Sequence, residues 1–189
     1  HMPSAKILGG VVARGHKPGG LEFLEVCFES GISDHIDGIS FHPYEQIPEM
    51  GNGRGFAAMR AMLDQSNPEL EWWQSEGGWP TQTGGWGQGM ARKTVNESKQ
   101  AIWLLRLLMR DLAADLDVTS YFHTTDFAEY VLDGSQGQPQ FFGLLRGDEH
   151  TPKPSYFAYQ CLCALFDADT VRDPMVLLRR FWRAGGDSF

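Results

Sequence analysis

The chain has 189 residues, of which 42% are hydrophobic, enough for one compact domain with a buried core. Its formal net charge of -8 is opposite to the Lys- and Arg-rich surface that phosphates attract, so we expect no nucleic-acid partner. No apolar run approaches the roughly 20 residues of a membrane-spanning helix, and residues 1–10 show no signal-peptide pattern. The sequence therefore predicts no membrane partner and leaves the compartment unknown, with the cytoplasm one option.

Strand patterns and helix patterns alternate along the chain. Short apolar or β-branched runs predict four strands, near residues 6–13, 37–42, 70–75 and 118–124. Apolar residues at helical spacing predict four helices, over residues 20–31, 56–65, 94–116 and 154–166. Such alternation indicates a parallel sheet with helices packed outside it.

The third of these helices is the longest. Thr94 and Glu97 fit a capping box at its start, and Asn96 is a rival cap. Its apolar periodicity predicts a core stripe made of Ile102, Leu105, Met109, Leu112 and Leu116.

Four βα units make up half of an eight-stranded barrel, so we predict an α/β fold, the (β/α)4 half of a TIM barrel. A flavodoxin-like open sheet needs about five strands and usually a phosphate-binding glycine loop, which the sequence lacks. Residues 6–168 form the predicted half-barrel, after a lead-in at 1–5 in which His1-Met2 has the form of a cloning remnant. The tail at 169–189 fits either a short helix or a truncated β-hairpin turning at Gly185-Gly186.

Reactive side chains stand at the ends of three predicted strands. His42 and Tyr44 follow the second strand, Glu76 follows the third, and His123 and Asp126 follow the fourth. Because barrel chemistry occurs at the carboxyl ends of the strands, these residues are the candidate site.

Glu76 is the most informative of them, because a carboxylate rarely ends an aromatic run. Strand alternation places Glu76 on the same side as Trp72 and Gln74, which we expect to face the barrel interior. An ionised carboxylate there needs hydrogen bonds, and Tyr44 on the preceding strand is placed to donate one.

The motifs at these positions resemble the C-terminal half of a retaining glycoside hydrolase of the large (β/α)8 clan that includes β-xylosidases, cellulases and β-galactosidases. "SFHPY" is similar to the His-x-Tyr after the sixth strand of that clan, and "WQSEGGW" to the nucleophile region of the seventh. "SYFHTTDF" resembles the eighth strand, and "FFGLL" with "TPKPSYFAY" resembles the segment before the final helix. The resemblance covers about residues 5–166.

The resemblance implies a role for each candidate. Glu76 would attack the anomeric carbon of a sugar, and Tyr44 would orient it. Phe122 stands where the clan usually has a tryptophan platform, and the tryptophans after Glu76 would offer other stacking surfaces. The predicted substrate-binding residues are His42, Trp79, Trp86, Phe122, His123 and Asp126.

Retaining hydrolysis also needs a second carboxyl group as acid/base. In the clan this is the Glu of an Asn-Glu-Pro turn, and the sequence contains no Asn-Glu-Pro. Asn96-Glu97 lies at a helix start, at the wrong end of the barrel. The resemblance therefore implies a fragment with weak or no hydrolysis of glycosides, which would act best on aryl glycosides, with no cofactor.

Two other functions fit the same residues. One is a carbohydrate-binding or scaffold half-barrel without turnover. The other is a metal-dependent amidohydrolase barrel using His42, His123 and Asp126, although the His-x-His usual on the first strand of such enzymes is absent. Expected partners are an oligosaccharide, polysaccharide or aryl glycoside, and further copies of the chain. The open sheet edges, with an inner face that we expect to carry Trp72, Phe41 and Phe122, favour a homo-oligomer.

Overall fold

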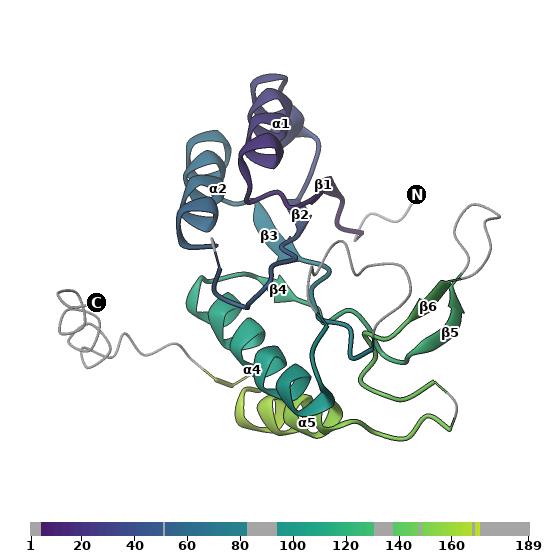
Figure 1. The fold of residues 1–189 in the computed structure, drawn as a ribbon. Coiled ribbons are helices and arrows are strands. Elements are labelled where there is room, and N and C mark those ends of the chain that lie inside the picture. Colours follow the sequence, from purple (N-terminus) through teal and green to yellow (C-terminus); the bar gives the residue numbers. More distant parts are fainter. Residues whose placement is uncertain are drawn as a thin grey trace, which may run out of the picture.

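A four-stranded parallel sheet forms the centre of the protein (Figure 1). The computed structural model describes residues 5–50, 52–82, 94–130, 138–147, 149–167 and 169–170. The strands lie in the order of the sequence and all pair in parallel: β1 (Leu8–Ala13), β2 (Gly38–His42), β3 (Glu71–Gln74) and β4 (Val118–Thr119). This is the predicted (β/α)4 arrangement of a half-barrel.

Helices connect and cover these strands. They are α1 (Pro18–Glu29), α2 (Asn52–Ser66), α4 (Glu97–Ala113) and α5 (Pro154–Leu165), with a short 3-10 turn η1 (Ile32–Asp34) after α1. In Figure 1, α1 and α2 lie together at one end of the sheet, and α4 and α5 lie together at the other. Proline at the first position begins both α1 and α5.

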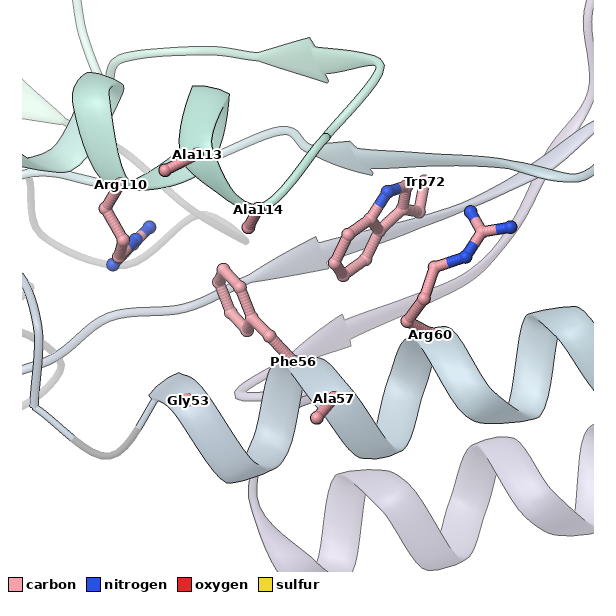
Figure 2. A pocket seen from close by; sticks show the side chains of 8 residues that line it. All are labelled: Gly53, Phe56, Ala57, Arg60, Trp72, Arg110, Ala113 and Ala114. Carbon is pink, nitrogen blue, oxygen red and sulfur yellow. The ribbon is translucent and has the colours of Figure 1, made fainter. Parts of the chain in front are cut away.

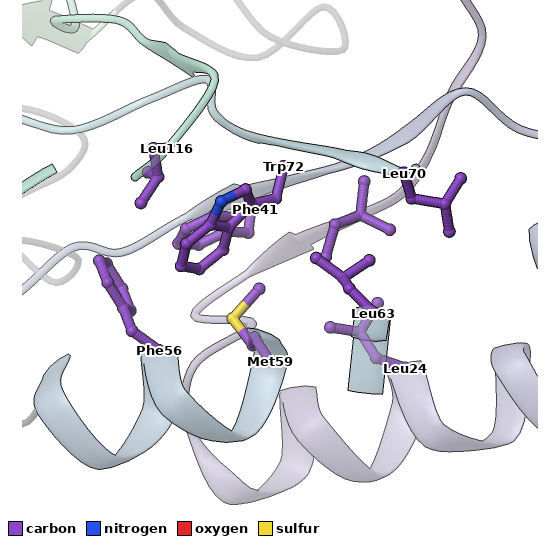
Figure 3. Packing of buried hydrophobic residues seen from close by; sticks show 9 residues of the cluster. Leu24, Phe41, Phe56, Met59, Leu63, Leu70, Trp72 and Leu116 are labelled. Carbon is purple, nitrogen blue, oxygen red and sulfur yellow. The ribbon is translucent and has the colours of Figure 1, made fainter. Parts of the chain in front are cut away.

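The main core lies between the sheet and the helices α1 and α2. Phe41 and Trp72 from the strands pack there against Phe56, Met59 and Leu63 of α2 (Figure 3). Phe41 and Trp72 are at most 1% exposed, so the prediction that they lie on an uncovered inner face was wrong.

Side chains alternate between the two faces of the sheet, and this places Phe41 and Trp72 on the face that the helices cover. Ser40 pairs with Trp73, and Trp73 pairs with Val118, so these three lie on the face opposite to Phe41 and Trp72. The strand β3 ends at Gln74, and the alternation therefore does not extend to Glu76.

Helix α4 buries a stripe that differs from the predicted one, although Leu116, just after the helix, is buried in the main core as predicted. Ile102, Met109 and Leu112 are exposed by 57%, 44% and 41%. The buried residues are Gln100, Trp103, Leu104, Leu107, Leu108 and Asp111. The Asn96 side chain accepts a hydrogen bond from the backbone N–H of Lys99, so Asn96 is the cap.

Two further strands were not predicted. β5 (Phe127–Tyr130) and β6 (Gln138–Gln140) pair antiparallel in a separate small sheet. They follow β4, which is shorter than its predicted range, and they leave the main sheet entirely parallel. The predicted tail hairpin, at residues 171–189, lies outside the described residues.

Candidate functional site

Glu76 lies just beyond the carboxyl end of β3, where Tyr44 and His42 reach it from the neighbouring strand. The Tyr44 hydroxyl donates to Glu76 Oε2 at 3.1 Å, and His42 Nδ1 lies 3.3 Å from the same oxygen. This is the geometry that the sequence predicts. Both contacts involve Oε2, so within the described part of the chain Oε1 has no hydrogen-bond partner. The Glu76 side chain is 32% exposed, which leaves Oε1 accessible to a ligand.

The two glycines after Glu76 are closely packed, and at Gly78 the neighbour is backbone, so only glycine fits there. A Cβ on Gly78 would come 2.4 Å from the backbone oxygen of Phe122, and one on Gly77 would come 2.2 Å from the Gln74 side-chain amide. The Phe122 N–H also donates to the Gly77 oxygen at 2.9 Å. The chain after β4 therefore fixes the turn that carries Glu76.

Tyr44 and Trp79 belong to a second core cluster at this end of the sheet. Each is 2% exposed and packs with Trp103, Leu107 and Phe142. The Trp79 ring meets Trp103 edge to face at 5.2 Å, and its indole N–H donates to the Glu45 carbonyl at 2.8 Å. A buried, hydrogen-bonded ring presents no face to a sugar in this structure, which argues against the predicted stacking role of Trp79. Trp86 lies outside the described residues.

Asp126 is held by partners inside the protein. It is 7% exposed, and Lys153, itself 1% exposed, donates to its Oδ1 at 2.8 Å. The Gly143 backbone N–H donates to the same oxygen at 2.8 Å, and Oδ2 lies 2.7 Å from the lysine nitrogen. Burial holds the pKa of Lys153 below its ordinary value, against the opposing effect of the Asp126 charge. Both carboxylate oxygens are engaged inside the protein, which argues against the predicted contact of Asp126 with substrate.

His123 is packed among aromatic rings. Its ring lies 4.4 Å from Phe122, 5.0 Å from Phe127 and 6.3 Å from Phe142. Both ring nitrogens are buried and make no hydrogen bond in the described structure. Burial lowers the pKa of His123 to about 4, and the nearby Thr125 backbone offsets this only in part. With both nitrogens buried, the His123 ring offers no exposed polar atom to a ligand, which argues against its predicted binding role. Phe122 is partly exposed, and its backbone N–H donates to Gly77, the residue after Glu76.

The structure adds three polar residues that the sequence did not indicate. Glu45 directly follows Tyr44, and it is 8% exposed. His16 and Lys17, in the loop after β1, both contact its carboxylate. Only the position of Glu45 next to Tyr44 could have drawn attention to it from the sequence.

Neither a metal centre nor a membrane span was found in the described ranges. They hold no group of three His, Cys, Asp or Glu side chains that could bind a metal ion. His42 contacts Glu76, while Asp126 pairs with Lys153, so the ligand set of the amidohydrolase reading is not assembled. No described helix is long and apolar enough to cross a membrane.

A cavity of about 390 Å³ lies on the helix side of the sheet, between α2 and α4 (Figure 2). Phe56 and Trp72 form part of its wall, with Arg60 and Arg110 beside them. Both guanidinium groups are already bound to aspartates of their own helices, Arg60 to Asp64 and Arg110 to Asp111. None of the residues that line the cavity is Glu76, Tyr44 or His42, so the cavity is separate from the candidate site.

Solved structures were the only comparison that gave matches. No family model and no curated protein matches the sequence. A GH2 β-galacturonidase from Eisenbergiella tayi superposes with a TM-score of 0.54 at 12% identity, over 85% of this chain and 33% of that one. A thermostable mutant of a xylanase from Cellvibrio japonicus gives a TM-score of 0.52 at 13% identity, over 78% of this chain and 46% of that one.

The fold is therefore an α/β half-barrel of the kind contained within these two larger structures. The chain spans less than half the length of each of these two proteins. At such low identity the comparisons establish the fold, and the chemistry must be argued from the residues.

Proposed function

We propose that the chain is the nucleophile-bearing half of a retaining β-glycosidase, with Glu76 as the nucleophile. The observation that carries the proposal is the Glu76 carboxylate at the carboxyl end of a parallel sheet, bound through Oε2 by Tyr44 and His42. The Tyr44 hydrogen bond and the contact with the His42 ring hold Oε2 and leave Oε1 to react. Residues at this end of the strands carry the chemistry in α/β barrels.

The proposed step transfers a glycosyl group to Glu76. Oε1 attacks the anomeric carbon, the bond to the leaving oxygen breaks, and the sugar becomes an ester of Glu76. The leaving oxygen normally takes a proton from the second carboxyl group, and the sequence has no Asn-Glu-Pro to provide it. An aryl oxide leaves without that proton, so aryl glycosides are the substrates of choice for the isolated chain.

Covalent labelling tests this directly. The protein is incubated with dinitrophenyl 2-deoxy-2-fluoroglycosides of xylose, glucose, galactose and galacturonic acid, and then weighed intact by mass spectrometry. We expect one added sugar, located at Glu76 by peptide mapping. Glu76→Gln should take up none, while Glu71→Gln should label like the unmodified protein. Glu71 is a matched control because its side chain, 27% exposed, is about as accessible as Glu76.

Absence of labelling with every sugar would contradict a nucleophilic Glu76. It would favour the second candidate, a carbohydrate-binding or scaffold half-barrel, which the missing Asn-Glu-Pro already makes reasonable. Sugar binding without labelling, measured by calorimetry, would identify that case.

We also propose that the chain associates with further copies of itself. A four-stranded parallel sheet has two edges, at β1 and β4, and edge strands offer unpaired backbone groups to other chains. A two-fold dimer is the simplest closed form.

A further inference from the structure

Glu45 is a buried carboxylate held by two side chains from another loop. His16 Nε2 lies 2.9 Å from Glu45 Oε1, and the Lys17 ammonium forms an ion pair with the same oxygen. The Glu45 side chain is 9% exposed, and the His16 side chain is fully buried. Because a buried charge is strongly unfavourable without partners, the three residues act as one unit, the His16–Lys17–Glu45 cluster.

His16 has one tautomer that suits this position. To donate to the carboxylate, the ring must carry its proton on Nε2. Burial lowers the pKa of His16, and the charges of Lys17 and Arg110 lower it further, against the opposing effect of Glu45. The ring is therefore neutral at neutral pH, and Nδ1 is buried with no partner among the described residues. A group that leaves a buried nitrogen unpaired is a poor choice for stability alone.

The loop that carries His16 is itself tightly held. The His16 ring meets Phe56 of α2 edge to face at 6.0 Å. A Cβ on Gly55 would come 2.2 Å from the His16 carbonyl oxygen, so only glycine fits beneath the loop. Contacts with α2 therefore fix the position of His16 independently of its contact with Glu45.

Glu45 also binds the loop after β3. Its carbonyl oxygen accepts the Trp79 indole N–H at 2.8 Å, and the Trp79 carbonyl accepts from Gln100 of α4 at 3.0 Å. The loops after β1, β2 and β3 therefore meet at this one residue, which is bonded covalently to Tyr44.

We propose that the His16–Lys17–Glu45 cluster is a positioning device that holds the Tyr44 hydroxyl against Glu76. The cluster contacts neither the Glu76 carboxylate nor a substrate position and acts only through the backbone at Tyr44. An effect of the cluster on catalysis rests on the proposed function. Its effect on the position of Tyr44 does not depend on that function.

The test follows Tyr44 independently of turnover. The protein is labelled with 3-fluorotyrosine, which gives one ¹⁹F signal for each of its five tyrosines. The signal that Tyr44→Phe removes is that of Tyr44. We expect His16→Leu to shift or broaden the Tyr44 signal while the other four stay in place. His16→Gln keeps an N–H donor of similar reach and should restore the signal.

Labelling of Glu76 by the fluoroglycoside gives the second measurement. We expect His16→Leu to slow it about 10- to 100-fold, as small misplacements of reacting groups do, and His16→Gln to recover most of the rate. A cluster that only stabilises the fold would lower the melting temperature of His16→Leu and leave the Tyr44 signal unchanged, which would overturn the proposal. If the unmodified protein takes up no label but the signal still moves, the glycosidase function fails and the positioning role stands.

A variant at the surface covers the case in which His16→Leu does not fold. Lys17 is 35% exposed at its side chain, so Lys17→Met removes one partner of Glu45 with little loss of packing. It should shift the Tyr44 signal in the same direction, and an unmoved signal would equally count against the cluster.

Discussion

Replacing His123 by phenylalanine should change how the stability of the protein depends on pH. Burial lowers the pKa of His123 from 6.5 to about 4 in the folded protein. In the unfolded chain the His123 ring therefore binds a proton below about pH 6.5. In the folded protein the ring stays neutral until the pH falls to about 4. Stability that depends on the neutral ring is complete above pH 6.5 and is lost as the pH falls toward 4.

The size of the effect follows from that interval. One pKa unit corresponds to about 1.4 kcal/mol, so the interval from 6.5 to about 4 sets an upper limit of about 3 kcal/mol. The residue is not fully buried, and solvent reduces the figure, so we expect about 1–2 kcal/mol. Phenylalanine has a similar shape, fits among Phe122, Phe127 and Phe142, and has no proton to bind.

Urea unfolding, followed by tryptophan fluorescence at pH 7.5, 5.5 and 4.5, measures the effect. Relative to the unmodified protein, His123→Phe should gain about 1–2 kcal/mol in free energy of unfolding between pH 7.5 and pH 4.5. His16 and Asp126 contribute equally to both proteins and cancel in the difference. His35→Gln, at an exposed position, is the control and should show no such gain. A His123→Phe curve parallel to that of the unmodified protein would refute the reasoning.

Two further predictions concern the buried ion pair and the sheet edges. Lys153→Met leaves the Asp126 carboxylate buried without its ammonium partner and should lower the free energy of unfolding by about 3–5 kcal/mol. The double variant with Asp126→Asn should recover much of that loss in the same urea assay; equal instability of the single and double variants would argue against the pairing. Light scattering after size-exclusion chromatography should show a homo-oligomer at micromolar concentration, and a clean monomer there would rule it out.

The helices and the parallel strands could be predicted because the spacing of apolar residues that marks them lies within each segment. Phe56, Met59 and Leu63 recur at helical spacing, and all three are buried against the sheet. The pairing of Tyr44 with Glu76 was also predictable, since both follow neighbouring parallel strands and so meet at one edge.

Helix α4 shows why periodicity can select the wrong face. The sequence has an apolar stripe through Ile102, Met109 and Leu112, but the buried stripe includes Gln100 and Asp111. Partners outside the helix satisfy Gln100, and Asp111 has both such a partner and its neighbour Arg110. Gln100 donates to the Trp79 carbonyl and accepts from Ser155, while Asp111 accepts from Thr119. No local pattern reveals such partners.

Two of the candidate site residues are enclosed by long-range contacts in the same way. Asp126 has the residue type of a catalytic group, but Lys153, 27 positions further along the chain, binds it inside the protein. Trp79 has the type of a sugar platform, but Trp103 and the Glu45 carbonyl enclose it. Residue type suggests what a side chain can do, while long-range contacts decide whether it is available.

The residues on the two faces of the sheet determine how much apolar surface is exposed for association between copies of the chain. Phe41 and Trp72 lie under the helices, and the opposite face carries Ser40, Ser75 and the Glu71–Lys6 ion pair. At the β1 edge, the exposed apolar side chains are Ile7, just before the strand, and Val11, which are 59% and 61% exposed. The pairing of β1 with β2 is irregular between Gly9 and Val12, and an irregular strand is a poorer template for continuous pairing with another chain. Because two apolar side chains and an irregular edge bury little surface, a dimer held at β1 should dissociate on dilution, whereas one held by a broad aromatic face would not.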